Sequence, residues 1–395
     1  MNSAQKAFAS GVSKHKDYRH AIREVSSAIQ KGLNGLSCDL ALFFVSETYT
    51  NLDPTVLIGE FRDTLSCRSL LGCNAAGVIG SDREIEMDPA ITAIGMHLPG
   101  VRLQPFTFTG DQIKDFRTGA DLIKSFDIYP TEKPHFICLA DPHSCDIERL
   151  LDDFNQAYKG LPVVGGLSSA GIMNIPAWLC LDDSVHDSGA VGYALTGDIE
   201  FDVVVSQGCR PIGKPYVVTR AEENVLYELA GKKALVAIRE LLESLNEKDR
   251  KLAEQSLHVG LAMDEHHDKF KPGDFLIRNL MGFDPEEDSL VVGATLKVGQ
   301  TLQFQVRDAE TSEEDLKRCL DLLPTGDSDH PRGAILFSCV GRGRNLYGKS
   351  DHDVKAIQAS RGPLALAGFF ANGEIGPVGA KNYVHGYTSS LLVIQ

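Results

Sequence analysis

Several features that would place this chain in a specialised class are scarce or missing from its 395 residues. The longest apolar stretches, such as residues 39–46 and 364–371, fall well short of the ~20 residues needed to cross a bilayer. The N-terminal stretch MNSAQKAFASGVSKHKDYRH contains no hydrophobic core of a signal peptide. We therefore expect a cytoplasmic protein that does not associate with membranes.

Basic residues are outnumbered by acidic ones. The chain has 39 Lys and Arg against 54 Asp and Glu, which gives a formal net charge of -15. A polyanion would meet net repulsion at such a surface, so nucleic acid and anionic membranes are not expected partners. With 43% hydrophobic and 24% charged residues, the composition is that of a globular protein rather than a disordered or fibrous one, and the length predicts two or three domains.

The nine cysteines include no C-x-x-C pair and are odd in number. Two of them, Cys138 in HFICLA and Cys339 in ILFSCV, lie inside apolar runs, which predicts reduced and buried thiols rather than a disulfide framework. The acidic and histidine-rich stretch 263-MDEHHDKF-270 is interpreted as a solvated turn. The sequence therefore predicts no metal site.

The common motifs of catalysis and cofactor binding are absent as well. The chain contains no G-x-S-x-G elbow, H-E-x-x-H pair, Walker loop or dinucleotide fingerprint. The glycine-rich segment 339-CVGRGRNLYG-348 fits neither the Walker loop nor the dinucleotide fingerprint. We predict no cofactor and favour a protein that is not an enzyme.

What the sequence does contain is an internal repeat. Residues 40–46, 135–141 and 333–339 are near-continuous apolar runs, typical of strands buried on both faces, and each is followed by a stretch of helical periodicity. A second apolar strand then ends in the pattern G-x-x-[AS]-[AN]-G, about 30 residues after the first. The pattern pairs Gly72 with Gly77, Gly166 with Gly171, and Gly368 with Gly373.

Strand-like runs between these units are separated by short turns, which predicts hairpins. The predicted pairs are 90–98 with 101–108, 189–195 with 199–206, and 290–296 with 301–308. We expect an α/β fold, with mixed α+β character, in which mixed sheets pack face to face and helices lie outside. We expect an N-terminal domain of two repeat units at 1–210, and a C-terminal domain at 211–395 that contains the third unit with a hairpin and helices.

Several motifs resemble the FIST family, the F-box and intracellular signal transduction domain proteins. In the first part these are FASGVS at 8–13, LLGCNAAGVI and GGLSSAG; in the second they are VRDAE, FSCVGRGRNLYG, GFFANGEIGPV and YVHGYTS. Together they cover nearly the full length. The resemblance implies paired N- and C-terminal FIST domains that act as a sensory module for a small ligand in signal transduction, with an unidentified signalling protein as a further partner.

A candidate ligand site follows where strand ends meet the glycine loops. Arg342 and Arg344 on a glycine-rich turn suit a ligand carboxylate, whereas Glu374 and Asp141 suit an ammonium group. A small zwitterion such as an amino acid satisfies both signs, with Tyr387 or a phenylalanine over its side chain. The further site residues that we predict are Gly72, Gly166, Gly368, Phe370, Asn372 and His385.

Each of these features has a second interpretation. The glycines can be present only because the backbone needs positive φ angles and close packing there. The arginines can be solvated, and His385 can be a hydrogen-bonded core residue. An enzyme that uses Cys339, Cys145 or His385 on a small metabolite is an alternative function. A protein-interaction scaffold without any ligand is a second alternative.

Overall fold

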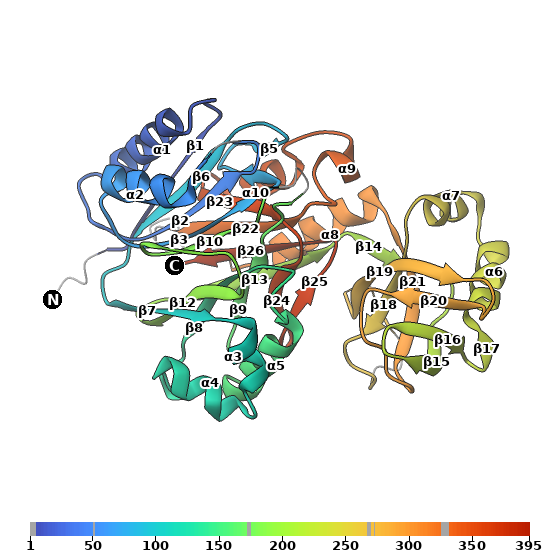
Figure 1. Ribbon diagram of the computed structural model, residues 1–395. Coiled ribbons are helices and arrows are strands. Elements are labelled where there is room, and N and C mark those ends of the chain that lie inside the picture. The colour runs from blue at the N-terminus through green and yellow to red at the C-terminus, as the bar shows by residue number, and fades with distance from the viewer. Residues whose placement is uncertain (1–4, 50–51, 172–174, 267–269, 272, 325–331) are drawn as a thin grey trace. The chain divides into compact units, whose positions relative to one another are not determined.

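The computed structural model describes residues 5–49, 52–171, 175–266, 270–271, 273–324 and 332–395 (Figure 1). The chain forms two compact units. The first unit comprises Met1–Val205, Leu316–Val384 and Thr388–Gln395, and the second comprises Ser206–Asp315 with His385–Tyr387. This division differs from the sequence boundary drawn at residue 210, because the chain returns to the first unit for its third repeat.

The three predicted repeat units are present in the first compact unit. In each, two parallel strands are joined by a helix that crosses between them. The units are β2 (Cys38–Ser46), α2 (Pro54–Leu65) and β3 (Cys67–Ala75); β8 (His135–Ala140), α5 (Ile147–Ala157) and β9 (Val163–Leu167); and β22 (Gly333–Cys339), α10 (His352–Arg361) and β23 (Ala365–Ala371).

Each repeat forms the centre of its own six-stranded mixed sheet. The first sheet has the order β1 (Ala7–Ser13), β6 (Ile91–His97), β2, β3, β10 (Leu179–Leu181) and β11 (Ser184–His186). The second runs β7 (Val101–Phe108), β12 (Ala190–Gly197), β8, β9, β24 (Glu374–Val378) and β25 (Lys381–His385). The third runs β13 (Phe201–Gln207), β26 (Thr388–Ile394), β22, β23, β4 (Gly77–Ile79) and β5 (Glu84–Glu86).

The last two strands of every sheet come from a different repeat. The hairpin β4–β5 follows the first glycine loop but pairs with β23 of the third repeat. The hairpin β10–β11 follows the second loop and pairs with β3 of the first repeat, while β24 follows the third loop and pairs with β9 of the second. The three sheets therefore exchange hairpins in a closed cycle.

The predicted hairpins between the repeats are wrong. The runs at 90–98 and 101–108 are strands β6 and β7, but they lie in different sheets, as do β12 and β13. In the second unit, β20 (Ser289–Val292) and β21 (Thr301–Arg307) share a sheet without being neighbours. The physical reason is that both edges of β6 are already occupied, by β1 and β2, so the strand after the turn has no free edge there.

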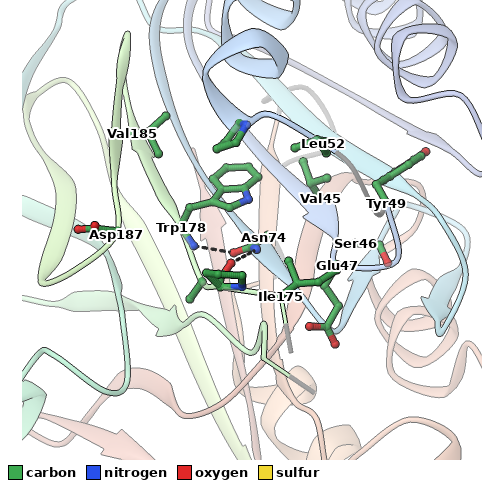
Figure 2. Close-up of a pocket in the computed structure, with 13 residues that line it drawn as sticks. Val45, Ser46, Glu47, Tyr49, Leu52, Asn74, Ile175, Trp178, Val185 and Asp187 are labelled. Atoms are coloured by element: carbon green, nitrogen blue, oxygen red, sulfur yellow. Dashed lines mark hydrogen bonds between the residues drawn. The ribbon is translucent and has the colours of Figure 1, made fainter. Parts of the chain in front are cut away.

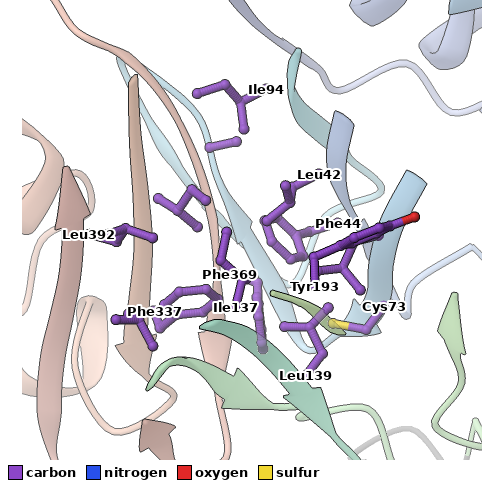
Figure 3. Close-up of a cluster of buried hydrophobic side chains, with 14 of the residues drawn as sticks. Leu42, Phe44, Cys73, Ile94, Ile137, Leu139, Tyr193, Phe337, Phe369 and Leu392 are labelled. Atoms are coloured by element: carbon purple, nitrogen blue, oxygen red, sulfur yellow. The ribbon is translucent and has the colours of Figure 1, made fainter. Parts of the chain in front are cut away.

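The three sheets face one another around a common apolar core. Figure 3 shows side chains of all three sheets converging, among them Phe44 of β2, Ile137 of β8 and Phe369 of β23. The rings of Phe44 and Phe369 lie 4.8 Å apart between centroids, and Phe337 meets Phe369 edge to face at 5.6 Å. Sheets packed face to face are thus confirmed, with three sheets taking part.

Helices cover the outer face of each sheet, also as predicted (Figure 1). Asp53 accepts a hydrogen bond from Thr55 N and precedes Pro54, so these two residues form the N-terminal cap of helix α2. The helices not yet given are α1 (Tyr18–Leu33) on the first sheet; α3 (Gly110–Asp115), α4 (Gly119–Phe126) and a 3₁₀ turn at Pro130–Glu132 near the second; and α8 (Ala309–Leu322) and α9 (Arg344–Tyr347) near the third.

The second compact unit contains an antiparallel sheet whose pairings close on themselves. The order β21, β15 (Tyr216–Glu222), β16 (Val225–Leu229), β20, β19 (Phe275–Asp284) and β18 (Leu257–Ala262) returns to β21. Such closure removes sheet edges that would otherwise attract other strands. The short strands β14 (Cys209–Pro211) and β17 (Lys232–Lys233) and the helices α6 (Ala234–Ser244) and α7 (Glu247–Gln255) complete the unit.

One glycine in each repeat is required by the closeness of the paired strands. A Cβ atom on Gly72, Gly165 or Gly368 would lie 2.4, 1.7 or 2.0 Å from a carbonyl oxygen of the neighbouring strand. In the second repeat this position is Gly165, the residue before the Gly166 of the sequence pattern. Close strand packing therefore explains the first glycine of the pattern in the first and third loops, Gly72 and Gly368, and the adjacent Gly165 in the second.

Substitution of these glycines tests this explanation. We expect Gly368→Ala to lower the free energy of unfolding by about 3 kcal/mol or more, because the methyl group forces β22 and β23 apart. Urea denaturation measures the change. Gly59→Ala in helix α2 is the control, since it has open space around its Cα and should raise stability by about 1 kcal/mol. Equal effects of the two substitutions would contradict the packing explanation.

Candidate functional site

The three glycine loops meet in the first compact unit. Ser169 of the second loop accepts a hydrogen bond from Ala76 N of the first loop at 2.9 Å and donates one to Phe370 O of the third. The second and third loops are joined further by Leu167, whose N donates to Gly373 O and whose O accepts from Asn372 N. The carboxyl ends of the repeats are therefore linked to one another directly.

A pocket of about 330 Å³ opens at the carboxyl ends of β2 and β3 (Figure 2). Strand ends with adjoining loops are a common place for ligands in α/β proteins. The pocket is lined mainly by apolar side chains with a few polar ones: Val45, Ser46, Glu47, Tyr49, Leu52, Pro54, Asn74, Ile175, Pro176, Ala177, Trp178, Val185 and Asp187.

Trp178, the single tryptophan of the chain, forms one wall of the pocket. Figure 2 shows its indole between Val185 and Val45. Asn74 holds the wall in place: its Oδ1 accepts from Trp178 N at 2.8 Å, and its Nδ2 donates to Pro176 O at 2.9 Å. The wall is thus attached to the end of β3 by side-chain hydrogen bonds.

The charged groups of the described lining are acidic. Glu47, directly after β2, is only 3% exposed, and its Oε2 accepts from Gly171 N at 2.8 Å. Asp187 is exposed at the rim. Tyr49 donates its hydroxyl to His15 O at 2.6 Å, and burial raises the pKa of this hydroxyl. A ligand with a positively charged or hydrogen-bond-donating group fits this lining best.

The two arginines predicted to hold a ligand lie in different environments. Arg342 is fully buried; its Nε and Nη2 donate to the two carboxylate oxygens of Asp353 at 2.8 and 2.9 Å, and Nη2 also donates to the Tyr347 hydroxyl. Burial alone would lower the pKa of Arg342. The charge and hydrogen bonds of Asp353, together with the other neighbours, outweigh this effect, so the pKa is raised above its ordinary value. Arg344 is exposed and donates from Nε to Ser350 Oγ.

Glu374 is also fully buried, at the start of β24. Its Oε2 accepts hydrogen bonds from the backbone N and the hydroxyl of Thr388, at 3.1 and 2.7 Å. Burial raises its pKa to about 8, against the opposing effects of Thr388 and then Arg342. At neutral pH this carboxyl group therefore carries a proton.

The other predicted site residues are distributed over the repeats. Asp141 accepts hydrogen bonds from the backbone and hydroxyl of Ser144, which is the ordinary arrangement of a loop leading into a helix. Gly72 and Gly166 pack inside strands, and Phe370 is buried on the helix side of the third sheet. Asn372 is exposed.

His385 and Tyr387 belong to the second compact unit. Tyr387 donates its hydroxyl to Asn279 Oδ1 at 2.9 Å, and its ring lies 4.3 Å from that of His258. His385 is 2% exposed. Of the acidic and histidine-rich stretch 263–270, residues 267–269 lie outside the described residues.

Sequence reasoning missed the residues that line the pocket. One signal was available, because Glu47 follows β2 just as Asp141 follows β8, so the repeat itself pointed to a carboxylate after the first strand. Trp178 and Asn74 gave no comparable signal. Their meeting depends on the β10 hairpin that enters the first sheet from the second repeat.

The structure thus defines a class: a protein of three pseudo-equivalent α/β repeats with a pocket at the carboxyl ends of its strands. Family models identify it further. The FIST N domain matches residues 39–232 and the FIST C domain matches residues 234–377. The chain belongs to the FIST family.

Relatives are found in mycobacteria. Proteins of Mycobacterium tuberculosis strain H37Rv and of Mycobacterium bovis, both titled uncharacterized, are 36% identical over 382 residues, which covers 96% of this chain and 97% of each relative. Among the described residues, no helix combines the length and the apolar character that a membrane crossing requires.

The buried Glu374 predicts a pH-dependent stability. Its pKa is raised from 4.5 to about 8, so between these values the unfolded chain loses a proton that the native protein keeps. The free energy of unfolding therefore falls with rising pH, and Glu374→Gln should remove this dependence. Relative to wild type, the variant should gain on the order of 3 kcal/mol between pH 5 and pH 8, measured by urea denaturation. The exposed Glu286→Gln is the control, and a gain that is the same at both pH values would contradict the prediction.

Proposed function

We propose that this protein is a sensory module that binds a small organic molecule in the pocket beside Trp178 and takes part in signal transduction. The observation that carries the proposal is the pocket itself, an apolar hollow with convergent polar groups at the carboxyl ends of β2 and β3. Membership of the FIST family supports the same function, since the family resemblance implies small-ligand sensing.

The hydrogen bonds around the pocket supply a route by which a ligand can influence the rest of the first unit. Asn74 holds the Trp178 wall, and its backbone O accepts from Ser168 Oγ at 2.7 Å. Ser169, the next residue, contacts the other two glycine loops. A ligand that displaces the wall would therefore strain the contacts among all three repeats, which is the kind of differential interaction that a sensor needs.

The lining favours a ligand that carries an amine. Glu47 and Asp187 supply negative charge, Trp178 supplies an aromatic face for a cation, and the described lining offers no basic side chain for a carboxylate. The amino-acid ligand predicted from the sequence remains a proposal. At the predicted third-repeat site its carboxylate would have to compete with Asp353 for Arg342.

The two alternative functions, an enzyme and a protein-interaction scaffold, predict different experimental outcomes. An enzyme using Cys339, Cys145 or His385 would turn over a metabolite, whereas a scaffold would bind partner proteins and no metabolite. A thermal-shift screen of metabolites separates these from a sensor, because a ligand that binds only the native state raises the melting temperature without being consumed.

The first prediction of this proposal concerns the location of the site. Ligands from the screen should change the fluorescence of Trp178, and Val185→Phe should weaken their binding at least tenfold, about 1.4 kcal/mol, by filling the pocket. Titration of each variant measures the dissociation constant. Val298→Phe, at a side chain 65% exposed in the second unit, is the matched control. Unchanged affinity in Val185→Phe would place the ligand elsewhere.

The second prediction concerns the charge of the ligand. We expect an amine to bind at least as tightly as the amino acid that differs from it only by a carboxylate. Glu47→Gln should weaken the amine about tenfold, as for a lost charge-assisted hydrogen bond. Calorimetric titration of matched pairs, such as tryptamine with tryptophan, measures both effects. Tighter binding of the amino acid, with a loss in Arg342→Ala, would favour the zwitterion site of the third repeat instead.

A further inference from the structure

The first compact unit contains a second pocket, which we call the Lys355 pocket to distinguish it from the Trp178 pocket of Figure 2. Leu364 directly precedes β23, and Ser81 lies in the turn between β4 and β5, so the Lys355 pocket is at the amino end of β23. The Trp178 pocket is at carboxyl ends of strands. The Lys355 pocket has a volume of about 440 Å³, which suits a small molecule. It is lined by Ser81, Asp82, Val354, Lys355, Gln358, Pro363 and Leu364.

Side-chain hydrogen bonds join the walls of the Lys355 pocket. Gln358 donates from Nε2 to Ser81 O at 2.7 Å and to Leu364 O at 3.3 Å. Its Oε1 accepts from Leu364 N at 3.1 Å. Glu84, just after the turn, adds another link, because its Oε1 accepts from Val354 N at 3.0 Å. The pocket is therefore preformed, and a ligand does not have to order its walls on binding.

The charged groups around the Lys355 pocket favour a ligand with a negative charge. Both carboxylate oxygens of Asp82 accept from Arg83, at 3.0 and 2.6 Å. Both oxygens of the neighbouring Asp351 are also engaged, since Oδ1 accepts from Glu84 N and Oδ2 from Lys355 Nζ at 3.1 Å. That contact uses one of the three N–H donors of the Lys355 ammonium group, whose side chain is 69% exposed. A ligand carboxylate can therefore bind Lys355, whereas a ligand amine meets acidic groups that are already paired.

Apolar side chains form the rest of the lining. Val354 and Leu364 are buried, and Pro363 is exposed at the edge. An ion as small as acetate would reach Lys355 but leave the apolar part of the pocket in contact with water. A hydrocarbon chain or ring attached to the carboxylate would cover this part, and the burial of apolar surface favours binding in proportion to its area. The lining thus fits a carboxylate that has an apolar body.

We propose that the Lys355 pocket is a second binding site, for small carboxylates with an apolar chain or ring. Lys355 binds the carboxylate, and Val354, Pro363 and Leu364 contact the apolar part. The site is separate from the Trp178 pocket and prefers the opposite charge, so the proposal does not depend on the function proposed for that pocket. Because Ser81 belongs to the hairpin that the first repeat contributes to the third sheet, a ligand here contacts two repeats at once.

The first test compares ligands that differ in one feature. Hexanoate, hexanol, hexylamine and acetate are titrated at pH 7 into the Val185→Phe variant, in which the Trp178 pocket is filled, and ligand-observed NMR measures each dissociation constant. We expect hexanoate to bind about fivefold more tightly than hexanol or hexylamine, and at least about tenfold more tightly than acetate. Hexanoate should bind wild type equally well. Absence of hexanoate binding, tighter binding of hexylamine, or a loss of hexanoate binding caused by Val185→Phe would overturn the proposal.

The second test locates the site. Lys355→Met keeps an apolar stem but removes the charge, so it should weaken hexanoate about fivefold and leave hexanol within about twofold of its original affinity. Lys355→Glu should reverse the preference, so that hexylamine binds more tightly than hexanoate. Lys251→Met is the matched control, because Lys251 makes the same i,i+4 contact, to Glu247 at 2.7 Å, with a side chain 68% exposed in the second unit. Equal effects of Lys355→Met on hexanoate and hexanol, or an equal effect of Lys251→Met on hexanoate, would overturn the proposal.

Discussion

The structure of the first compact unit depends on the meeting of three glycine loops at the carboxyl ends of their strands. Each loop sends the chain out of its own sheet, and the hairpin that follows completes the sheet of another repeat. Ser169 joins the three loops through two hydrogen bonds. Because every sheet needs a hairpin from another repeat, no repeat is complete alone, and the three must form together. The shared core around Phe44, Phe337 and Phe369 follows from this arrangement.

The same constraint sets the chemistry at each strand end. The three repeats carry different residues after their first strands, β2, β8 and β22, and the local structure there differs accordingly. In the first repeat Glu47 and the entering Trp178 segment leave a pocket. In the second, Asp141 accepts a hydrogen bond from Ser144 N within a turn. In the third, Arg342 and Asp353 form a buried ion pair. One fold unit thus carries three different sets of residues at its strand ends.

A buried ion pair of this kind is costly to desolvate and is retained only when its hydrogen bonds are well satisfied. Both carboxylate oxygens of Asp353 accept from Arg342, and Asp353 accepts from Ser338 as well, while the Tyr347 hydroxyl accepts from Nη2 of Arg342. From the sequence alone, two arginines on a glycine-rich turn look like a solvated anion site. Only the fold shows that one of them points inward, because the partner that draws it in, Asp353, lies on the following helix.

The sequence by itself determined the strands and helices of three units and that these units repeat, because apolar periodicity and glycine spacing are local properties that burial imposes directly. It also located the carboxylate of Asp141 after the first strand of the second repeat, although it missed Glu47 at the same place in the first repeat. The tertiary structure decided which strands pair, since the three predicted hairpins had no free edge to form on. It decided as well that Arg342 and Glu374 are buried, that His385 and Tyr387 belong to the second unit, and that Trp178 meets Asn74. Each of these depends on contacts between residues far apart in the chain, which periodicity within a segment cannot encode.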